Sequence, residues 1–233
     1  MKRKIIPVVT NAVLLLIVLA VSLVGFWGGS AVAVSGDDDR LFYRGNSVNG
    51  VSLMFNIYEN TDNVGKIMDI LDEYGAKATF FIGGSWADDN IDCVREIFLR
   101  GHEVASHGYF HKDHAKLNYK QNVEEILPSA KLINMICNTQ ITLFAPPSGS
   151  FSEATLTACA YLDLRVIMWS RDTIDWRDSD VDLIVRRATK DLKAGEFVLM
   201  HPKDVTVTAL PQILTYIDGA DLTAITVTQN LGE

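Results

Sequence analysis

Cysteine is scarce in this chain of 233 residues, which contains only three. So few cysteines exclude a small protein held together by a framework of disulfides. None of them belongs to a Cys-x-x-Cys pair, and this excludes a thiolate zinc site and a thioredoxin-like redox motif. Cys93, Cys137 and Cys159 fall in segments with helical periodicity, where we expect small buried apolar side chains.

Basic residues are also in short supply, because 21 Lys and Arg face 29 Asp and Glu and leave a formal net charge of −8. This acidic balance argues against a nucleic-acid partner, since affinity for phosphate groups comes from Lys and Arg. Hydrophobic residues make up 48 % of the chain, which is normal for a globular protein and too much for a disordered one. The remaining classes are an enzyme-sized domain or a binding domain of similar size.

Charge is absent from the run between Ile5 and Trp27, which follows a basic cluster at residues 2–4. A helix of that length can span a bilayer, and the positive-inside rule places the residues after it outside the cytoplasm. The basic cluster speaks against a buried core helix. A cleaved signal segment is the alternative, because Ala31-Val32-Ala33 has the small-x-small pattern of a cleavage site. We therefore expect a single-pass protein of the cell membrane with an extracytoplasmic domain, or a secreted protein if cleavage follows Ala33.

Three parts follow from this reading: residues 1–34 as the cytoplasmic end with its anchor or signal segment, residues 35–49 as a polar linker, and residues 50–233 as the folded domain. Strand and helix periodicities alternate along the folded domain. Strands are predicted at 51–55, 77–82, 102–106, 141–144, 165–169, 196–200 and 222–227, with helices between them. This alternation indicates one α/β domain of parallel strands joined by helical crossovers. Pro128 is expected to kink or break the helix at 119–136.

Polar residues with chemical potential follow the predicted strands at the point where each strand ends. They are Asn56, His107, Pro146 with Pro147, Asp172 with Asp175, and His201. The carboxyl ends of parallel strands in a barrel face one side, and that rim is where such folds place their sites. We therefore expect these side chains to share one rim.

Histidines supply the strongest of these signals. His107 and His111 are four residues apart, and two imidazoles at that spacing can converge on one divalent cation. An exposed polar loop is the alternative. His201 has the chemistry of a general acid, and Asp172 or Asp175 could accept its other N–H. A capped core histidine and a helix-capping aspartate are the alternatives for these residues.

Three short motifs occur in the order that they have in a known enzyme family. They are His107-Gly108-Tyr109-Phe110-His111 for H-[ST]-x-x-H, Asp172-Thr173-Ile174-Asp175-Trp176 for D-x-x-D-W, and Leu199-Met200-His201 for L-x-H. On these motifs residues 50–233 resemble the metal-dependent polysaccharide deacetylases. The resemblance implies a distorted (β/α)7 barrel that removes N-acetyl groups from cell-wall or chitin-like glycan, with a divalent metal ion, zinc, as cofactor.

The resemblance also implies a role for each matching residue. His107 and His111 would ligate the metal ion, and His201 would protonate the leaving amine. Leu199 would line the pocket for the acetyl methyl group. Further substrate contacts are expected from Trp176, Tyr109, Pro146 and Pro147.

Two departures from the family pattern fall on catalytic positions. The family segment Thr-Phe-Asp-Asp-Gly is Met54-Phe55-Asn56-Ile57-Tyr58 here, so Asn56 replaces the general base and Ile57 the metal-binding carboxylate. The Arg that pairs with the base is replaced by Ala145. Glu59 is a candidate substitute as base or ligand, and a solvated residue near a helix start is its alternative role. Asp113 and His114, which follow His111 closely in the sequence, are other candidate ligands.

Two functions remain open from the sequence. One is an extracytoplasmic metal-dependent carbohydrate N-deacetylase of atypical or weak activity, because loss of a positioned base costs about 10²–10⁴-fold in rate. The other is an inactive homologue that binds cell-wall glycan, since a fold does not fix a function.

Overall fold

The computed structural model describes residues 40–232, and the predicted anchor or signal segment lies outside them. Within these residues no helix is long and apolar enough to cross a bilayer. Strand β2 (Gly50–Ile57) is an internal strand of the sheet, and all of its residues are buried. A strand that is covered on both faces needs apolar residues on both, which explains its largely apolar sequence.

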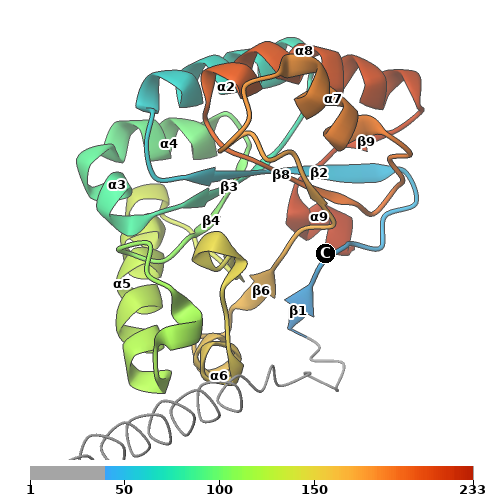
Figure 1. Ribbon diagram of the computed structural model, residues 1–233. Coiled ribbons are helices and arrows are strands. Elements are labelled where there is room, and N and C mark those ends of the chain that lie inside the picture. Colours follow the sequence, from blue (N-terminus) through green and yellow to red (C-terminus); the bar gives the residue numbers. More distant parts are fainter. Residues whose placement is uncertain (1–39, 233) are drawn as a thin grey trace, which may run out of the picture. The chain divides into compact units, whose positions relative to one another are not determined.

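Seven strands form the barrel in chain order. β2 is followed by β3 (Thr79–Ile82), β4 (Glu103–Ser106), β5 (Leu143–Phe144), β6 (Arg165–Ile167), β7 (Arg171–Asp172) and β8 (Phe197–Met200). Their spatial order is β6-β5-β4-β3-β2-β8-β7, and all of these neighbours are parallel. The sheet is curled but not closed, because β6 and β7 are the ends of this row (Figure 1). This α/β arrangement agrees with the predicted distorted (β/α)7 barrel.

Strand β1 (Leu41–Phe42) extends the sheet beyond β6. Nearby, Arg44 pairs with Glu196 through a backbone bridge and a 2.8 Å ion pair. The prediction of a linker at 35–49 is therefore wrong for residues 40–49, whose backbone is tied to the barrel. Little in the sequence indicates β1, because a two-residue strand in a polar segment has no measurable periodicity.

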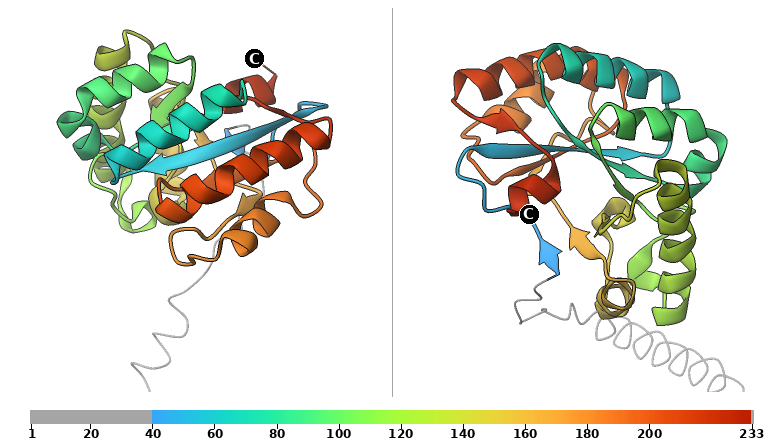
Figure 2. Two further views of the ribbon diagram at one scale, coloured as in Figure 1. Left: turned by 90° about the horizontal axis from the view of Figure 1, so that it is seen from above. Right: turned by 180° about the vertical axis from the view of Figure 1, so that it is seen from behind.

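Helices cover the outer face of the sheet. They are α2 (Thr61–Glu73), α3 (Gly84–Asp89), α4 (Ile91–Leu99), α5 (Tyr119–Cys137), α6 (Glu153–Tyr161), α7 (Val181–Thr189) and α8 (Asp204–Gly219). Figure 2 shows α2 and α8 side by side across β2, and their apolar faces join the strands in one large core. The amino end of the barrel is closed by α9 (Val227–Leu231), because Val227 enters the smaller inner cluster. The carboxyl ends of the strands remain free to form a site.

Two elements differ from the sequence prediction. Helix α5 continues through Pro128 instead of breaking there, since its buried face and the capping box at Asn118 offset a proline cost of about 3 kcal/mol. The strand expected at 222–227 is reduced to β9 (Thr223–Ala224), which pairs with β2. Thr226 instead caps α9 by accepting the backbone N–H of Gln229.

Candidate functional site

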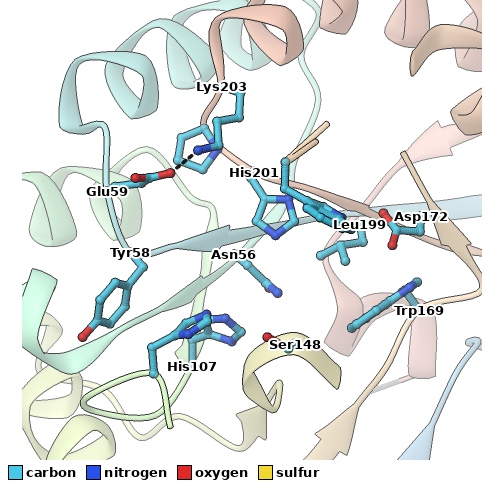
Figure 3. A pocket seen from close by; sticks show the side chains of 13 residues that line it. Asn56, Tyr58, Glu59, His107, Ser148, Trp169, Asp172, Leu199, His201 and Lys203 are labelled. Atoms are coloured by element: carbon cyan, nitrogen blue, oxygen red, sulfur yellow. Dashed lines mark hydrogen bonds and ion pairs between the residues drawn. The ribbon is translucent and has the colours of Figure 1, made fainter. Parts of the chain in front are cut away.

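A pocket of about 580 Å³ opens at the carboxyl ends of the strands, as the strand-end residues predicted (Figure 3). Predicted residues in its lining are Asn56, Glu59, His107, His111, Asp172, Trp176, Leu199 and His201. Lining residues that the sequence did not single out are Tyr58, Ser148, Trp169, Pro202 and Lys203. The three histidines expected to gather at one mouth of the barrel therefore do so.

His201 follows β8 and is held by the buried carboxylate of Asp175. Oδ1 of Asp175 accepts the Nδ1–H of His201 at 2.7 Å, and Oδ2 accepts the backbone N–H of His201 at 2.6 Å. Oδ2 also accepts the hydroxyl of Thr206 in α8, at 2.5 Å. Because a carboxylate can only accept, Nδ1 carries a proton and the ring presents Nε2 to the pocket. Of the two predicted partners it is thus Asp175 that orients His201.

Asp172 has a different place. It lines the pocket, and its Oδ1 accepts the backbone N–H of Ile174 at 2.8 Å. Asp175 does not line the pocket and is 3 % exposed. The two carboxylates of the motif therefore differ in role, because Asp172 faces the pocket and Asp175 positions the histidine.

His107 and His111 lie on the opposite side of the pocket, at the end of β4. Their ring centroids are 5.1 Å apart, as the spacing predicted. Nδ1 of His107 donates to the backbone carbonyl of Ala145 at 2.8 Å, so Nε2 of the neutral ring carries a lone pair. Burial lowers the pKa of His107 to about 3, and burial also lowers the pKa of His111. Both rings are therefore neutral at physiological pH.

The end of β2 lies between these two groups, and its side chains alternate. Asn56 faces the pocket with its Nδ2 atom, whereas Oδ1 is buried and has no hydrogen-bond partner within residues 40–232 (Figure 3). Ile57 points the other way and is fully buried in the helix-side core. Tyr58 returns to the pocket and packs on His111, with ring centroids 5.1 Å apart.

The donors around the histidine pair do not fit a resident divalent ion. A catalytic zinc site uses three protein ligands and an open position. Here the family's carboxylate position is Ile57, and in the described part of the chain no three His, Cys, Asp or Glu side chains are grouped to hold a metal ion. Glu59, the candidate substitute, forms an ion pair with Lys203. The divalent ion expected at His107 and His111 stays a prediction, and this donor set does not support it.

Three residues predicted to contact substrate lie outside the pocket lining. The ring of Tyr109 packs on Gly84, and its hydroxyl donates to Asp88 at 2.7 Å. Pro146 and Pro147 are buried. In the turn after β5 it is Ser148, with a positive φ of 55°, that lines the pocket instead of these prolines.

The lining residues that were missed carried weak signals. Tyr58 is two residues after Asn56, so the alternation of a strand puts both on one face. Trp169 is the last residue of the predicted strand at 165–169, and Lys203 follows His201 by two residues. None of these spacings is specific enough to single out a site without the fold.

Comparison with known proteins decides the family. Residues 44–167 match the model of the polysaccharide deacetylase family. The chain belongs to this family. By descent it is a homologue of polysaccharide and peptidoglycan deacetylases, and deacetylases of the family generally depend on a metal ion.

Relatives of this deacetylase homologue carry related names. Over 82 % of its length it is 31 % identical to uncharacterized protein YlxY of Bacillus subtilis, of which it spans 60 %. It is 29 % identical to a chitooligosaccharide deacetylase of Sinorhizobium fredii over 67 % of this chain and 74 % of that protein. A peptidoglycan-N-acetylglucosamine deacetylase of Bacillus cereus is 28 % identical over 65 % of this chain and 55 % of its own length. The chain thus spans little more than half of two of these relatives.

Solved structures with the same fold include a pseudoenzyme. BA3943 of Bacillus anthracis, described as a CE4 family pseudoenzyme, superposes with a TM-score of 0.79 at 29 % identity, over 82 % of this chain and 68 % of that one. A mutant of BA3943, described as having restored enzymatic activity, gives the same TM-score at 28 % identity, over 82 % and 71 % of the two chains. Loss of activity on an intact barrel therefore occurs among the proteins that this chain resembles.

Proposed function

We propose that this protein binds N-acetylated cell-wall or chitin-like glycan in the pocket and does not turn it over at an enzymatic rate. The observation that carries the proposal is the division of the pocket. The side with Asp175 and His201 is complete, whereas the position of the base is an amide with an unpartnered oxygen. Binding needs shape, apolar contact and a few polar groups, and the pocket retains these.

An acetamido group matches the groups that face the pocket. Its carbonyl oxygen can accept from Nδ2 of Asn56, and its N–H can donate to Nε2 of His201. Its methyl group can pack on Leu199, a residue of β8 that lines the pocket. Two indole rings, Trp169 and Trp176, offer apolar faces to sugar rings, and Trp176 is 54 % exposed.

Hydrolysis lacks the group that would activate water. The amide of Asn56 takes no proton at any relevant pH, and loss of a positioned base costs about 10²–10⁴-fold in rate. The buried histidines could act as bases only if they faced a bound water, and the low pKa of His107 makes it a weak base. The pocket as it stands therefore favours a bound glycan over a reacting one.

A slow deacetylase is the second candidate, favoured by the complete pair of Asp175 and His201. Nε2 of His201 faces the pocket, where a protonated ring could give its proton to a leaving amine. Asp175 would stabilise the charged ring, because its Oδ1 lies 2.7 Å from Nδ1.

One experiment separates the two candidates. The purified full-length chain is titrated with an N-acetylglucosamine tetramer while tryptophan fluorescence and released acetate are measured. Saturable binding without acetate supports the binding protein. Acetate release that is lost in His201→Ala supports the slow enzyme, and absence of both signals overturns both candidates.

A matched pair of variants tests whether binding occurs in this pocket. Trp176→Ala should weaken binding about tenfold, because it removes an aromatic surface from the rim. Tyr161→Ala is the control, since Tyr161 is also an exposed aromatic residue (70 %) but lies in α6 outside the pocket. Equal effects of the two changes would place the glycan elsewhere.

We also propose that the domain lies outside the cytoplasm, tethered to the membrane or released. The proposal rests on the charge-free run Ile5–Trp27 and the basic residues before it. Alkaline phosphatase fused after Glu233 should be active in cells, because that enzyme matures only outside the cytoplasm. An inactive fusion at normal expression would contradict this location.

A further inference from the structure

Tyr58 occupies a prepared position beside the histidine pair. Its hydroxyl accepts the Oγ–H of Ser85 in α3 at 2.8 Å. Its ring lies against Gly83, where an added Cβ atom would come within 2.3 Å of Cδ2 of Tyr58. Only glycine at position 83 leaves room for this ring, so the side chain is seated by two neighbours and is not a free surface residue.

The seated ring continues into a row of three. The ring centroids of Tyr58 and His111 are 5.1 Å apart with an interplanar angle of 55°, and those of His111 and His107 are also 5.1 Å apart at 69°. His107 is fixed at the far end by its hydrogen bond to the carbonyl of Ala145. Tilted aromatic contacts of this kind each contribute attraction without any charge. The row therefore holds His111 from both sides.

Carboxylates near the row are all engaged by other groups. Glu125, which is 2 % exposed, accepts the backbone N–H of Phe110 and pairs with Lys112 at 3.3 Å. Glu59 is paired with Lys203. Among residues 40–232 no carboxylate joins the two histidines in a group of three side chains that could hold a cation, which agrees with the poor fit of the donor set to a divalent ion.

We propose that Tyr58 positions the histidine pair in the role that a metal ion has in the family's deacetylases, so that this pocket is organised without metal. Ile57 and Tyr58 act together. Ile57 packs in the hydrophobic core at the position where the family has its metal-binding carboxylate, and Tyr58 places an aromatic ring beside His111. The inference concerns how the pocket is held, and it stands independently of the glycan that the pocket binds.

The wild-type protein gives the first test. Full-length protein purified without chelator should contain less than about 0.1 equivalent of divalent metal by mass spectrometry, and EDTA should leave its melting temperature unchanged. Calorimetric titration with Zn²⁺ should show no stoichiometric site that His107→Ala removes. A stoichiometric zinc site that depends on His107 would overturn the proposal.

Variants of the two β2 residues give the second test. Ile57→Asp with Tyr58→Gly should create a zinc site that His107→Ala removes, because a carboxylate is strongly disfavoured in the apolar core where Ile57 lies, and glycine at position 58 frees the end of β2 to turn that carboxylate toward the histidines. Ile57→Asp with Tyr58→Phe is the matched control, because it keeps the ring and should bind zinc more weakly than the glycine variant. Equal zinc affinity of the two variants would show that Tyr58 has no part in excluding the metal and would overturn its assigned role.

Discussion

The two sides of the pocket differ in how many of the family's catalytic groups they retain. On the β7–β8 side, Asp175 makes three hydrogen bonds and presents His201 to the cavity. On the β2 side, Asn56 has an unpartnered buried oxygen and Ile57 belongs to the core. We call these the acid side (Asp172, Asp175, Leu199 and His201) and the altered side (Asn56, Ile57, Tyr58 and Ala145).

The difference teaches that an intact motif is not by itself a sign of catalysis. Asp175 ties the chain after β8 to α8 through His201 and Thr206, so its carboxylate contributes to stability whether or not any reaction occurs. Asn56 and Ile57, at the positions of the family's base and metal carboxylate, do not tie elements together in this way, because Asn56 Oδ1 has no hydrogen-bond partner in the described residues and Ile57 has no polar side chain. Residues with only a catalytic role can be replaced without loss of the fold, and the altered side shows that pattern.

Repair of the altered side should give the largest effect. Asn56→Asp, Ile57→Asp, Tyr58→Gly and Ala145→Arg together restore a base, its partner and a third ligand. We expect acetate release from N-acetylglucosamine oligomers with added zinc to rise about 10²–10⁴-fold, the usual contribution of a positioned base. His201→Ala in the repaired chain is the control and should abolish the gain. A folded repaired protein with no gain would show that the acid side is not competent.

Stability should separate the two sides next. Asp175→Ala leaves three donors, two on His201 and one on Thr206, without their acceptor and should lower the free energy of unfolding by about 3 kcal/mol. Asn56→Ala removes an oxygen that has no partner and should change it by less than about 1 kcal/mol. Urea denaturation of both variants measures this contrast. Similar losses of unfolding free energy in the two variants would contradict the view that Asp175 stabilises the fold and Asn56 does not.

Acid should destabilise the protein through its buried neutral histidines. Burial lowers the pKa of His107 in the pocket to about 3 and that of His102, in tilted ring contact with Phe80 outside the pocket, to about 4. The unfolded chain takes up these protons near pH 6.5, so stability is full above that pH and falls as pH decreases toward 4. We expect a loss of roughly 3 kcal/mol from His102 alone by pH 4, since each unit of pKa difference corresponds to about 1.36 kcal/mol.

A variant isolates that contribution. His102→Phe keeps a ring against Phe80 and removes two buried nitrogen atoms that lack partners in the described part of the chain. Its unfolding free energy should fall less between pH 7 and pH 4.5 than that of the wild type. An identical pH dependence in the two proteins would contradict the assignment.

The smallest effect is expected at the rim between the two sides. Glu59 and Lys203 form an ion pair with partly exposed side chains, and such pairs contribute less than about 1 kcal/mol. A double-mutant cycle with Glu59→Gln and Lys203→Met should give a coupling energy that shrinks with added salt. A coupling above about 2 kcal/mol would show that the pair is part of the pocket's structure and not an incidental contact.

Much of the fold and of the site could be predicted from the sequence, because both depend on where strands end. Period-2 and helical patterns located the barrel strands, and the strand-end rule brought His107, His111 and His201 together. The choice between Asp172 and Asp175 could not be made, since both spacings reach the same rim. The peptide at Ile174, with a positive φ of 57°, turns one carboxylate outward and the other inward.

Other residues were predicted wrongly or missed for physical reasons. Tyr109 has the kind of aromatic ring that stacks on sugars, but its contacts with Gly84 and Asp88 hold the ring and the hydroxyl outside the pocket lining. Tyr58 stands at a position that is glycine in the family pattern, so the motif directed attention away from it. The alternation of side chains along β2 is the signal that could have identified Tyr58 as a pocket residue.

The most direct test of a glycan-binding pocket without turnover is a single ¹³C NMR experiment. Full-length protein is mixed with excess N-acetylglucosamine tetramer labelled in its acetyl groups, and the methyl signals are followed for one day. We predict shifted or broadened acetyl signals from bound oligomer, which Trp176→Ala weakens, and no signal of free acetate. Free acetate that grows with catalytic turnover, or acetyl signals that the protein leaves unchanged, would contradict the account.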